Sequence, residues 1–327
     1  MKNTSKTIIF FGNERLATGV TTTAPVLTGL IEAGYDIVAV ISNYTSGNSR
    51  SKRALEIQAV AEAHNIPLLL PTKLNEIRQQ IVEFKADAAV LVAYGKIVPQ
   101  DVIDIFPHGI INIHPSLLPK HRGSTPIESA ILKGDTKTGV SIMQLAKDMD
   151  AGPVFGQSEF ELTGKESKQE LADKLLQIGA AMVTDLLPEI LDGRVVALPQ
   201  DESVATYDKL IAKEDGAIDW QKSAQQIERE VRAYAGWPGS QAIIGGREVI
   251  VTQARAESPS TLLSSSLSDE AAQASESNGG VNREPGETIV EDKKLKVQTG
   301  DGLLVIEKLK PTGKAEMDAQ SFINGYL

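Results

Sequence analysis

The stretch AAVLVAYGKIVPQDVIDIFPHGIINIH, residues 88–114, contains two apolar runs separated by a more polar segment. The first run, Ala88–Ala93, has the composition of a central strand, and the second is the shorter Gly109–Ile113. Near-continuous apolar runs of this length are typical of strands buried on both faces of a parallel sheet. These residues therefore predict two strands of an α/β sheet.

Strand-like and helix-like segments alternate from this stretch back to the N-terminus. The further expected strands are Thr7–Phe11, Ile37–Ile41 and Pro67–Leu70, and the expected helices are Val26–Ala33, Ala54–His64 and Leu74–Phe84. Such alternation predicts a parallel sheet with helices on both faces. Ligands of these sheets bind beyond the carboxyl ends of the strands, where we expect Tyr94-Gly95 and Asn112 to His114.

The segments that follow complete an expected N-terminal domain of residues 1–193. They predict a helix over Pro126–Lys133, strands over Gly139–Leu145 and Val154–Leu162, and a helix over Lys168–Leu191 that a glycine stops. Residues 194–220 are expected to connect this domain to a second one.

A second domain is expected over residues 221–327, where the pattern changes to short strands. A helix over Ser223–Ala235 comes first, and Ala319–Gly325 is expected as a closing helix. The strands between them are Gln241–Ile244, Glu248–Gln253, Glu287–Val290, Lys294–Gln298 and Leu303–Leu309. Five short strands with turns predict a small β-barrel. Residues 259–283 form an acidic insert without aromatic residues, for which we expect disorder.

The composition narrows the class of protein. The 327 residues are 41% hydrophobic and 23% charged, as in an ordinary globular protein. The absence of cysteine excludes disulfides, thiolate nucleophiles and thiolate metal sites. No apolar run is long enough to span a bilayer and the N-terminus lacks a signal-peptide pattern, so we expect a cytoplasmic protein without a membrane partner.

The net charge of −10 is unevenly distributed. Residues 256–292 hold eight acidic residues and one basic residue, so they supply −7 and leave −3 for the rest. A basic patch of Arg50, Lys52 and Arg53 follows the second expected strand. Three such cations are by themselves more often a solvated surface, but their place after a strand favours a role at the mouth of a site.

Three polar residues carry the candidate chemistry. Asn112 and His114 are two apart, so on a strand their side chains share one face. With Asp150 they supply a hydrogen-bond donor, an imidazole and a carboxylate, which are the groups needed to move an acyl group between nitrogens. Alone, His114 is more often structural. Asp148 and Asp150 could also be a solvated turn or a metal pair, but no further ligand accompanies them and we expect no metal.

These residues lie within a series of longer motifs, which are Val92-Ala93-Tyr94-Gly95, Asn112-Ile113-His114-Pro115-Ser116-Leu117-Leu118-Pro119, Arg122-Gly123, Gly139-Val140-Ser141-Ile142-Met143-Gln144 and Asp150-Ala151-Gly152. The series resembles the family of 10-formyltetrahydrofolate-dependent formyltransferases. Further motifs resemble the methionyl-tRNA formyltransferase branch of this family. They are Ala205-Thr206-Tyr207, Lys213 to Trp220 and Trp237-Pro238-Gly239. The resemblance implies a Rossmann-like catalytic domain with a parallel or mixed sheet, followed by a small OB-like barrel domain that binds tRNA.

The resemblance also implies a reaction and a set of site residues. The formyl group of 10-formyltetrahydrofolate, a co-substrate, would pass to the α-amine of methionyl-initiator tRNA and give N-formylmethionyl-tRNA for translation initiation. Catalysis would use Asn112, His114 and Asp150, and whether His114 or Asp150 takes the amine proton stays open. Folate would contact Ser116, Leu117, Leu118, Pro119, Val92, Ala93, Tyr94 and Gly95. The tRNA would contact Arg50, Lys52 and Arg53, and we expect a monomer.

Other interpretations remain possible at this stage. The same motifs fit a formyltransferase that acts on an amino-sugar nucleotide, or a hydrolase that releases formate from formyltetrahydrofolate. A catalytically silent RNA-binding protein is a further class, because OB-like barrels bind RNA by themselves. His121 has only a small prior chance of direct catalysis and is expected at the edge of the pocket.

Overall fold

The computed structural model describes residues 6–43, 56–257 and 283–327. Arg50, Lys52 and Arg53, and all of the acidic insert except Arg283, lie outside the described residues. The chain divides into two compact units, Met1–Leu210 and Ile211–Leu327.

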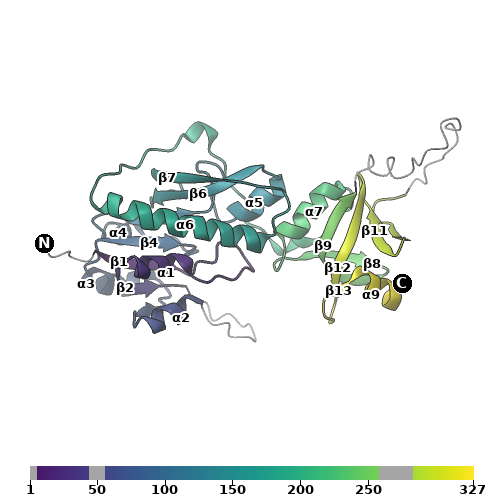
Figure 1. Cartoon of the computed structure of the whole chain (residues 1–327), viewed down its shortest axis with the longest axis horizontal. Coiled ribbons are helices and arrows are strands. Elements are labelled where there is room, and N and C mark those ends of the chain that lie inside the picture. The colour runs from purple at the N-terminus through teal and green to yellow at the C-terminus, as the bar shows by residue number, and fades with distance from the viewer. Residues whose placement is uncertain (1–5, 44–55, 258–282) are drawn as a thin grey trace. The chain divides into compact units, whose positions relative to one another are not determined.

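The first unit is built on a seven-stranded sheet in the order β3-β2-β1-β4-β5-β6-β7 (Figure 1). Its strands are β1 (Thr7–Gly12), β2 (Asp36–Ile41), β3 (Leu68–Leu69), β4 (Ala88–Val92), β5 (Ile110–His114), β6 (Lys137–Gln144) and β7 (Val154–Glu161). The first five strands run parallel to one another. Strand β6 is antiparallel to both of its neighbours, β5 and β7. The expected Rossmann-like, partly mixed sheet is therefore confirmed.

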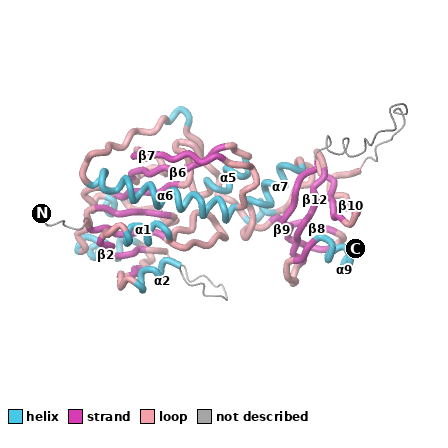
Figure 2. The backbone as a smooth tube through the Cα atoms, viewed as in Figure 1, coloured by secondary structure: helices cyan, strands magenta, loops and turns pink. Residues whose placement is uncertain are grey.

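Helices cover both faces of this sheet (Figure 2). They are α1 (Pro25–Glu32), α2 (Glu56–Ala63), α3 (Arg78–Glu83), α4 (Gln100–Ile103), α5 (Pro126–Lys133) and α6 (Lys168–Leu191). Gly179 of α6 lies so close to β5 that a Cβ there would be 2.6 Å from Cγ2 of Ile113. Ile110 instead joins a core cluster with Val102 and Ile103 of α4. The two faces of β5 thus pack against different helices, as the period of two in a strand requires.

A buried carboxylate holds the start of α1 after β1. The Glu14 side chain is fully buried and accepts hydrogen bonds from the backbone N–H groups of Val26 (2.9 Å) and Leu27 (2.8 Å). Burial raises the pKa of Glu14 to about 7, although those two hydrogen bonds lower it. Glu14 therefore serves as the side-chain acceptor for the first turn of α1, where backbone N–H groups have no partner within the helix.

The second unit is an antiparallel sheet with two helices against it. The pairing path is β10-β11-β12-β9-β8, and β13 pairs with β12. The elements are α7 (Ala224–Ala233), β8 (Ser240–Ile244), β9 (Arg247–Glu257), β10 (Thr288–Glu291), β11 (Lys294–Gln298), β12 (Leu303–Pro311), β13 (Met317–Asp318) and α9 (Ala319–Tyr326). Its core includes Ile227 of α7, Leu304 of β12 and Phe322 of α9.

Some predicted boundaries were wrong. The expected helix over 74–84 is a 3-10 turn, η1 (Leu74–Ile77), followed by α3, and α4 was not predicted at all. The strand expected over 88–93 ends at Val92, because Ala93 has a φ of 49° and leaves the extended conformation. The connecting segment holds two short turns, η2 (Glu202–Val204) and η3 (Lys213–Gly216).

Candidate active site

Asn112 and His114 lie on the face of β5 that turns away from α6. Ile113 between them contacts Gly179 of α6, so alternation places both polar side chains on the opposite face. Both residues are buried, with exposed fractions of 6% and 5%. The carboxyl end of the strand thus presents an amide and an imidazole in a nearly enclosed setting.

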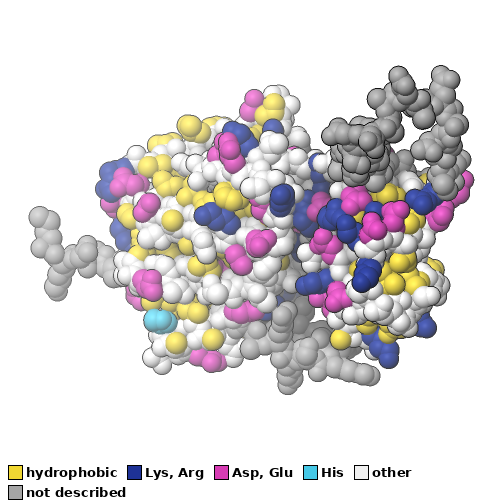
Figure 3. Space-filling model, turned by 45° about the vertical axis from the view of Figure 1, so that its right-hand side comes forward, with side chains coloured by type: hydrophobic (Ala, Val, Ile, Leu, Met, Phe, Trp, Pro, Cys, Tyr) yellow, Lys and Arg dark blue, Asp and Glu magenta, His cyan; other side chains and the backbone are white. Residues whose placement is uncertain are grey.

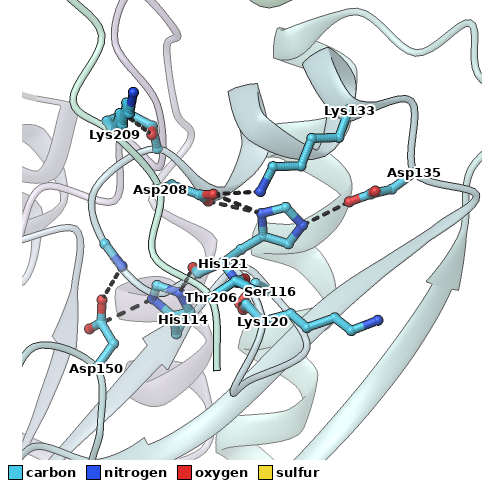
Figure 4. Close-up of polar contacts among 12 residues, drawn as sticks. His114, Ser116, Lys120, His121, Lys133, Asp135, Asp150, Thr206, Asp208 and Lys209 are labelled. Atoms are coloured by element: carbon cyan, nitrogen blue, oxygen red, sulfur yellow. Dashed lines mark hydrogen bonds and ion pairs between the residues drawn. The ribbon is translucent and has the colours of Figure 1, made fainter. Parts of the chain in front are cut away.

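Asp150 reaches the same place from a different part of the sheet. Gln144, the last residue of β6, pairs with Ile111, three residues before His114. The segment between β6 and β7 therefore has to return along β5 before it meets the histidine. It does so with Asp150 in the left-handed region (φ 49°), and Asp150 Oδ1 lies 3.9 Å from His114 Nδ1 (Figure 4).

Hydrogen bonds orient both side chains. His114 Nε2 lies 2.9 Å from the carbonyl oxygen of His121, and a carbonyl only accepts, so Nε2 must carry a proton. In the neutral imidazole this leaves the lone pair on Nδ1, the atom that faces Asp150. Asp150 Oδ2 accepts from the backbone N–H of Gly123 at 2.8 Å. Since 3.9 Å exceeds a direct hydrogen bond, a reacting amine can approach His114 Nδ1 and Asp150 Oδ1 together.

The Asn112 carboxamide is available for a ligand. Among the described parts of the chain, no side-chain or backbone group hydrogen-bonds to it. An amide with free N–H groups at the end of a strand can stabilise negative charge on an oxygen that approaches His114.

A hydrogen-bond network centred on the buried Arg122 holds the segment that carries Asp150. Gln200 Nε2 donates to the carbonyl oxygens of Asp150 and Gly152, both at 2.7 Å. Gln200 Oε1 in turn accepts from the fully buried guanidinium of Arg122, at 2.8 and 3.1 Å. Arg122 also donates to Glu202 at 2.6 and 2.9 Å and to the Tyr207 hydroxyl at 2.7 Å. The Arg122 of the sequence motif therefore acts within the protein, as the centre of this network.

The predicted folate residues 116–119 form a turn whose groups are largely engaged. Ser116 Oγ donates to the Lys120 carbonyl at 2.7 Å, and Ser141 Oγ donates to the Ser116 carbonyl at 2.7 Å. The Leu118 N–H donates to Ser141 Oγ at 3.0 Å. Ser116 and Leu118 are buried, and Leu117 packs against Gly139. Only a minority of this turn's groups thus remain for a ligand, and its folate contacts stay a prediction.

In the second predicted folate segment, residues 92–95, only Gly95 is exposed. The Tyr94 ring is buried edge-to-face against Phe11, at 5.6 Å between centroids, and burial raises its pKa to about 12. Asn43 Nδ2 donates to the Tyr94 carbonyl at 2.5 Å. Ser42 Oγ and Asn43 Oδ1 are buried polar atoms without a hydrogen-bond partner in the described structure. Unpaired polar atoms beside an exposed glycine turn suit a polar heterocycle.

Asp208 and Gln200 are polar residues near the site that the sequence did not mark, whereas His121 was expected at the edge of the pocket. Asp208 and Gln200 lie in the expected connection, where no motif marked them. Within the described ranges, no group of His, Asp and Glu side chains is placed to hold a metal ion. No helix of those ranges is long and apolar enough to cross a membrane.

Comparison with known proteins gives consistent matches for both halves of the chain. Residues 8–187 match the family described as formyl transferase, and residues 210–327 match formyl transferase, C-terminal domain. A methionyl-tRNA formyltransferase of Sulfurihydrogenibium sp. (strain YO3AOP1) is 36% identical over 307 residues, which cover 92% of either chain.

Two solved structures share the fold at low sequence identity. An N-formyltransferase from Helicobacter canadensis, in complex with folinic acid and dTDP-3-aminofucose, is 16% identical with a TM-score of 0.65, over 94% of this chain and 99% of that one. HypX from Aquifex aeolicus with tetrahydrofolic acid is also 16% identical, with a TM-score of 0.63, over 98% of this chain. The chain spans about half of HypX (47%).

Proposed function

Because the chain belongs to the formyl transferase family, in its methionyl-tRNA formyltransferase branch, we infer that it transfers a formyl group to the amino group of methionyl-tRNA. The observation that carries this inference is the 36% identity over 92% of the chain, which includes the C-terminal unit as well as the catalytic one. The family uses formyl-folate as donor, and we propose 10-formyltetrahydrofolate here. The product is N-formylmethionyl-tRNA, which serves translation initiation.

We propose that Asn112, His114 and Asp150 perform the transfer. The methionine amine attacks the formyl carbon, a new C–N bond forms, and negative charge develops on the formyl oxygen. Asn112 donates to that oxygen; loss of such a donor in other acyl-transfer sites costs ~3 kcal/mol. The bond from the formyl carbon to the folate nitrogen then breaks, and that nitrogen gains a proton.

The orientation of His114 supports it as the proton carrier. Its Nδ1 is the unprotonated ring nitrogen, because Nε2 donates to the His121 carbonyl. Nδ1 accepts the amine proton and can return it to the leaving nitrogen. Asp150 at 3.9 Å stabilises the imidazolium that forms between these steps. Asp150 is then a carboxylate throughout the reaction and His114 is the general base and acid.

The placement of the two substrates is a further part of the proposal. We propose that the folate head group contacts the backbone of residues 93–95 and the unpaired atoms Ser42 Oγ and Asn43 Oδ1. Val92 and residues 116–119 would line the same folate site. Initiator tRNA contacts Arg50, Lys52 and Arg53 and the C-terminal unit. Figure 3 shows acidic and basic side chains interspersed on one face of that unit, so this face has no patch of uniform positive charge that would mark a tRNA-binding surface. We also propose that the protein is a monomer and that it works in the cytoplasm, where translation initiation uses this acceptor.

The test compares three acceptors with one donor. Purified protein is incubated with 10-formyltetrahydrofolate and methionyl-initiator tRNA, with an amino-sugar nucleotide, or with no acceptor. We expect formylation of the tRNA alone. Binding should weaken as salt rises, because the protein's cationic side chains release counterions from the phosphates and that release is less favourable at high salt. Formyl transfer to the sugar nucleotide, or rapid release of formate without acceptor, would show that the proposed acceptor is wrong.

A further inference from the structure

His121 lies between two carboxylates next to the catalytic histidine. Its Nδ1 is 2.9 Å from Asp208 Oδ2, and its Nε2 is 2.7 Å from Asp135 Oδ2 (Figure 4). An ionised carboxylate only accepts hydrogen bonds, so both ring nitrogens must donate and the ring is an imidazolium. Lys133 completes the group with a 3.0 Å ion pair to Asp208, whose side chain is only 1% exposed.

Asp208 belongs to a strap, residues 206–209, that lies along the segment after His114. The Arg122 N–H donates to the Thr206 carbonyl at 2.9 Å, and the Asp208 N–H donates to the Arg122 carbonyl at 2.9 Å. The His121 N–H donates to Thr206 Oγ1 at 2.8 Å. His121 has a φ of 59°, in the left-handed region that favours glycine. The strap and the ion pairs therefore hold a backbone conformation that this residue would not adopt readily by itself.

The backbone held in this way is the one that orients the catalytic pair. The His121 carbonyl accepts from His114 Nε2 at 2.9 Å, and the Gly123 N–H donates to Asp150 Oδ2 at 2.8 Å. A rotation of the peptide at His121 would remove the acceptor that fixes the tautomer of His114. The ion pairs of the His121 ring are thus linked to the chemistry through two backbone hydrogen bonds.

We propose that the His121 imidazolium, bound between Asp208 and Asp135, is a positioning residue that keeps His114 in its Nδ1-basic tautomer. The proposal deepens the function proposed above and rests on it for its kinetic consequences. A neutral His121 can donate to only one of the two carboxylates. Deprotonation therefore removes the hydrogen bond either to Asp208 of the strap or to Asp135. Turnover should therefore fall as pH rises through the pKa of His121.

The charges around His121 set the direction of that pH effect. Burial lowers the pKa of His121, but the hydrogen bonds to Asp208 and Asp135 and the charge of Asp208 outweigh it, so the pKa lies above its ordinary value. Lys133 acts in the opposite direction and lowers it. Glu128 of α5, itself 3.8 Å from Lys168, also interacts electrostatically with Asp208. Removing an acid should then move the alkaline decline of turnover to lower pH, and removing Lys133 should move it to higher pH.

The experiment combines imidazole NMR with pH–rate profiles. With four histidines in the chain, nitrogen-15 spectra can assign the tautomer of His114 and the titration of His121. We expect Asp208→Asn to lower the pKa of His121, to mix the His114 tautomers, and to reduce kcat about tenfold with little change in KM. Lys133→Met should shift the alkaline limb the other way. Asp192→Asn, which removes a surface partner of Lys6 and Arg194, is the matched control and should change neither readout.

The two readouts separate the possible failures. A His114 tautomer and an alkaline limb that stay unchanged while the pKa of His121 falls in Asp208→Asn would overturn the proposal. If wild-type protein formylates no tRNA, the proposed function fails, and the His114 tautomer in the variants still decides whether His121 positions it. If Asp208→Asn does not fold, Lys133→Met decides alone, and an alkaline limb that does not move upward contradicts the proposal.

Discussion

The strand β5 and the segment between β6 and β7 each supply one member of the His114–Asp150 pair, but they are held in different ways. Pairing with β4 and β6 fixes the strand β5, in which His114 pairs with Ser141 of β6, and the close packing of Gly179 on Ile113 sets which face His114 occupies. Asp150 depends on side chains from the connecting segment, above all Gln200. The strand thus holds His114 through backbone pairing and core packing, whereas the loop holds Asp150 through side-chain hydrogen bonds from a residue 50 positions away in the sequence.

The largest expected effect comes from the loop residue itself. Asp150→Asn keeps an acceptor for the Gly123 N–H but removes the charge that, in the proposed mechanism, stabilises the His114 imidazolium. We expect kcat to fall about a thousandfold with unchanged thermal unfolding, in the range typical of acid–base groups. Asp148→Asn, an exposed neighbour in the same segment, is the control and should retain wild-type turnover. Near-normal kcat in Asp150→Asn would remove Asp150 from the mechanism.

The next effect tests how the strand is held. Gly179→Val places a branched side chain where a Cβ alone would already lie 2.6 Å from Ile113. We expect the free energy of unfolding to fall by about 2 kcal/mol, the usual cost of overpacking a core. Ala181→Val, at an exposed position of the same helix, should cost only the small difference in helix propensity. Equal losses in urea denaturation of the two variants would show that α6 does not press on β5.

A smaller effect should follow when the loop that carries Asp150 loses only the hydrogen bonds from Gln200. Gln200→Glu keeps an acceptor for Arg122 but removes both N–H donors to the Asp150 and Gly152 carbonyls. We expect kcat to fall about tenfold, because Asp150 is displaced rather than lost. Steady-state kinetics beside Asp150→Asn measure the two contributions. A fall as large as that of Asp150→Asn would mean that these hydrogen bonds and the carboxylate act as one unit.

The smallest effect concerns Glu14, which accepts hydrogen bonds from the first turn of α1. Its pKa of about 7 in the folded protein exceeds the ordinary value of 4.5, so the folded state binds the proton more tightly. Its contribution to stability is therefore present at low pH and is lost as pH rises from about 4.5 to about 7. Glu14→Gln should remove this part of the pH dependence, a change on the order of 1 kcal/mol between pH 5 and pH 8.

Urea denaturation at those two pH values measures the effect. Glu14→Ala serves as the comparison, because it leaves the N–H groups of Val26 and Leu27 unpaired at every pH and should lower stability at both. If the stability difference between Glu14→Gln and wild type is the same at pH 5 and pH 8, burial does not raise the pKa of this carboxyl.

Much of the fold could be predicted because its signals are local. Apolar runs such as Ile110–His114 and the helix Lys168–Leu191 with its glycine stop mark themselves in the sequence. The short helix α4 was missed because four residues carry too little periodicity. The left-handed turn at Ala93 was missed because no glycine or asparagine marks it.

The candidate site likewise has some features that local sequence patterns predict and others that depend on contacts between distant residues. The sequence by itself determined the α/β fold, the family, and the residue types that fit formyl transfer, since each of these depends on short patterns. Tertiary structure alone decided that β6 runs antiparallel to β5, that Gln200 and Arg122 bring Asp150 back to His114, and that His121 lies between Asp208 and Asp135. These contacts join residues far apart in the chain, and no local pattern encodes a distance between such residues until the chain has folded.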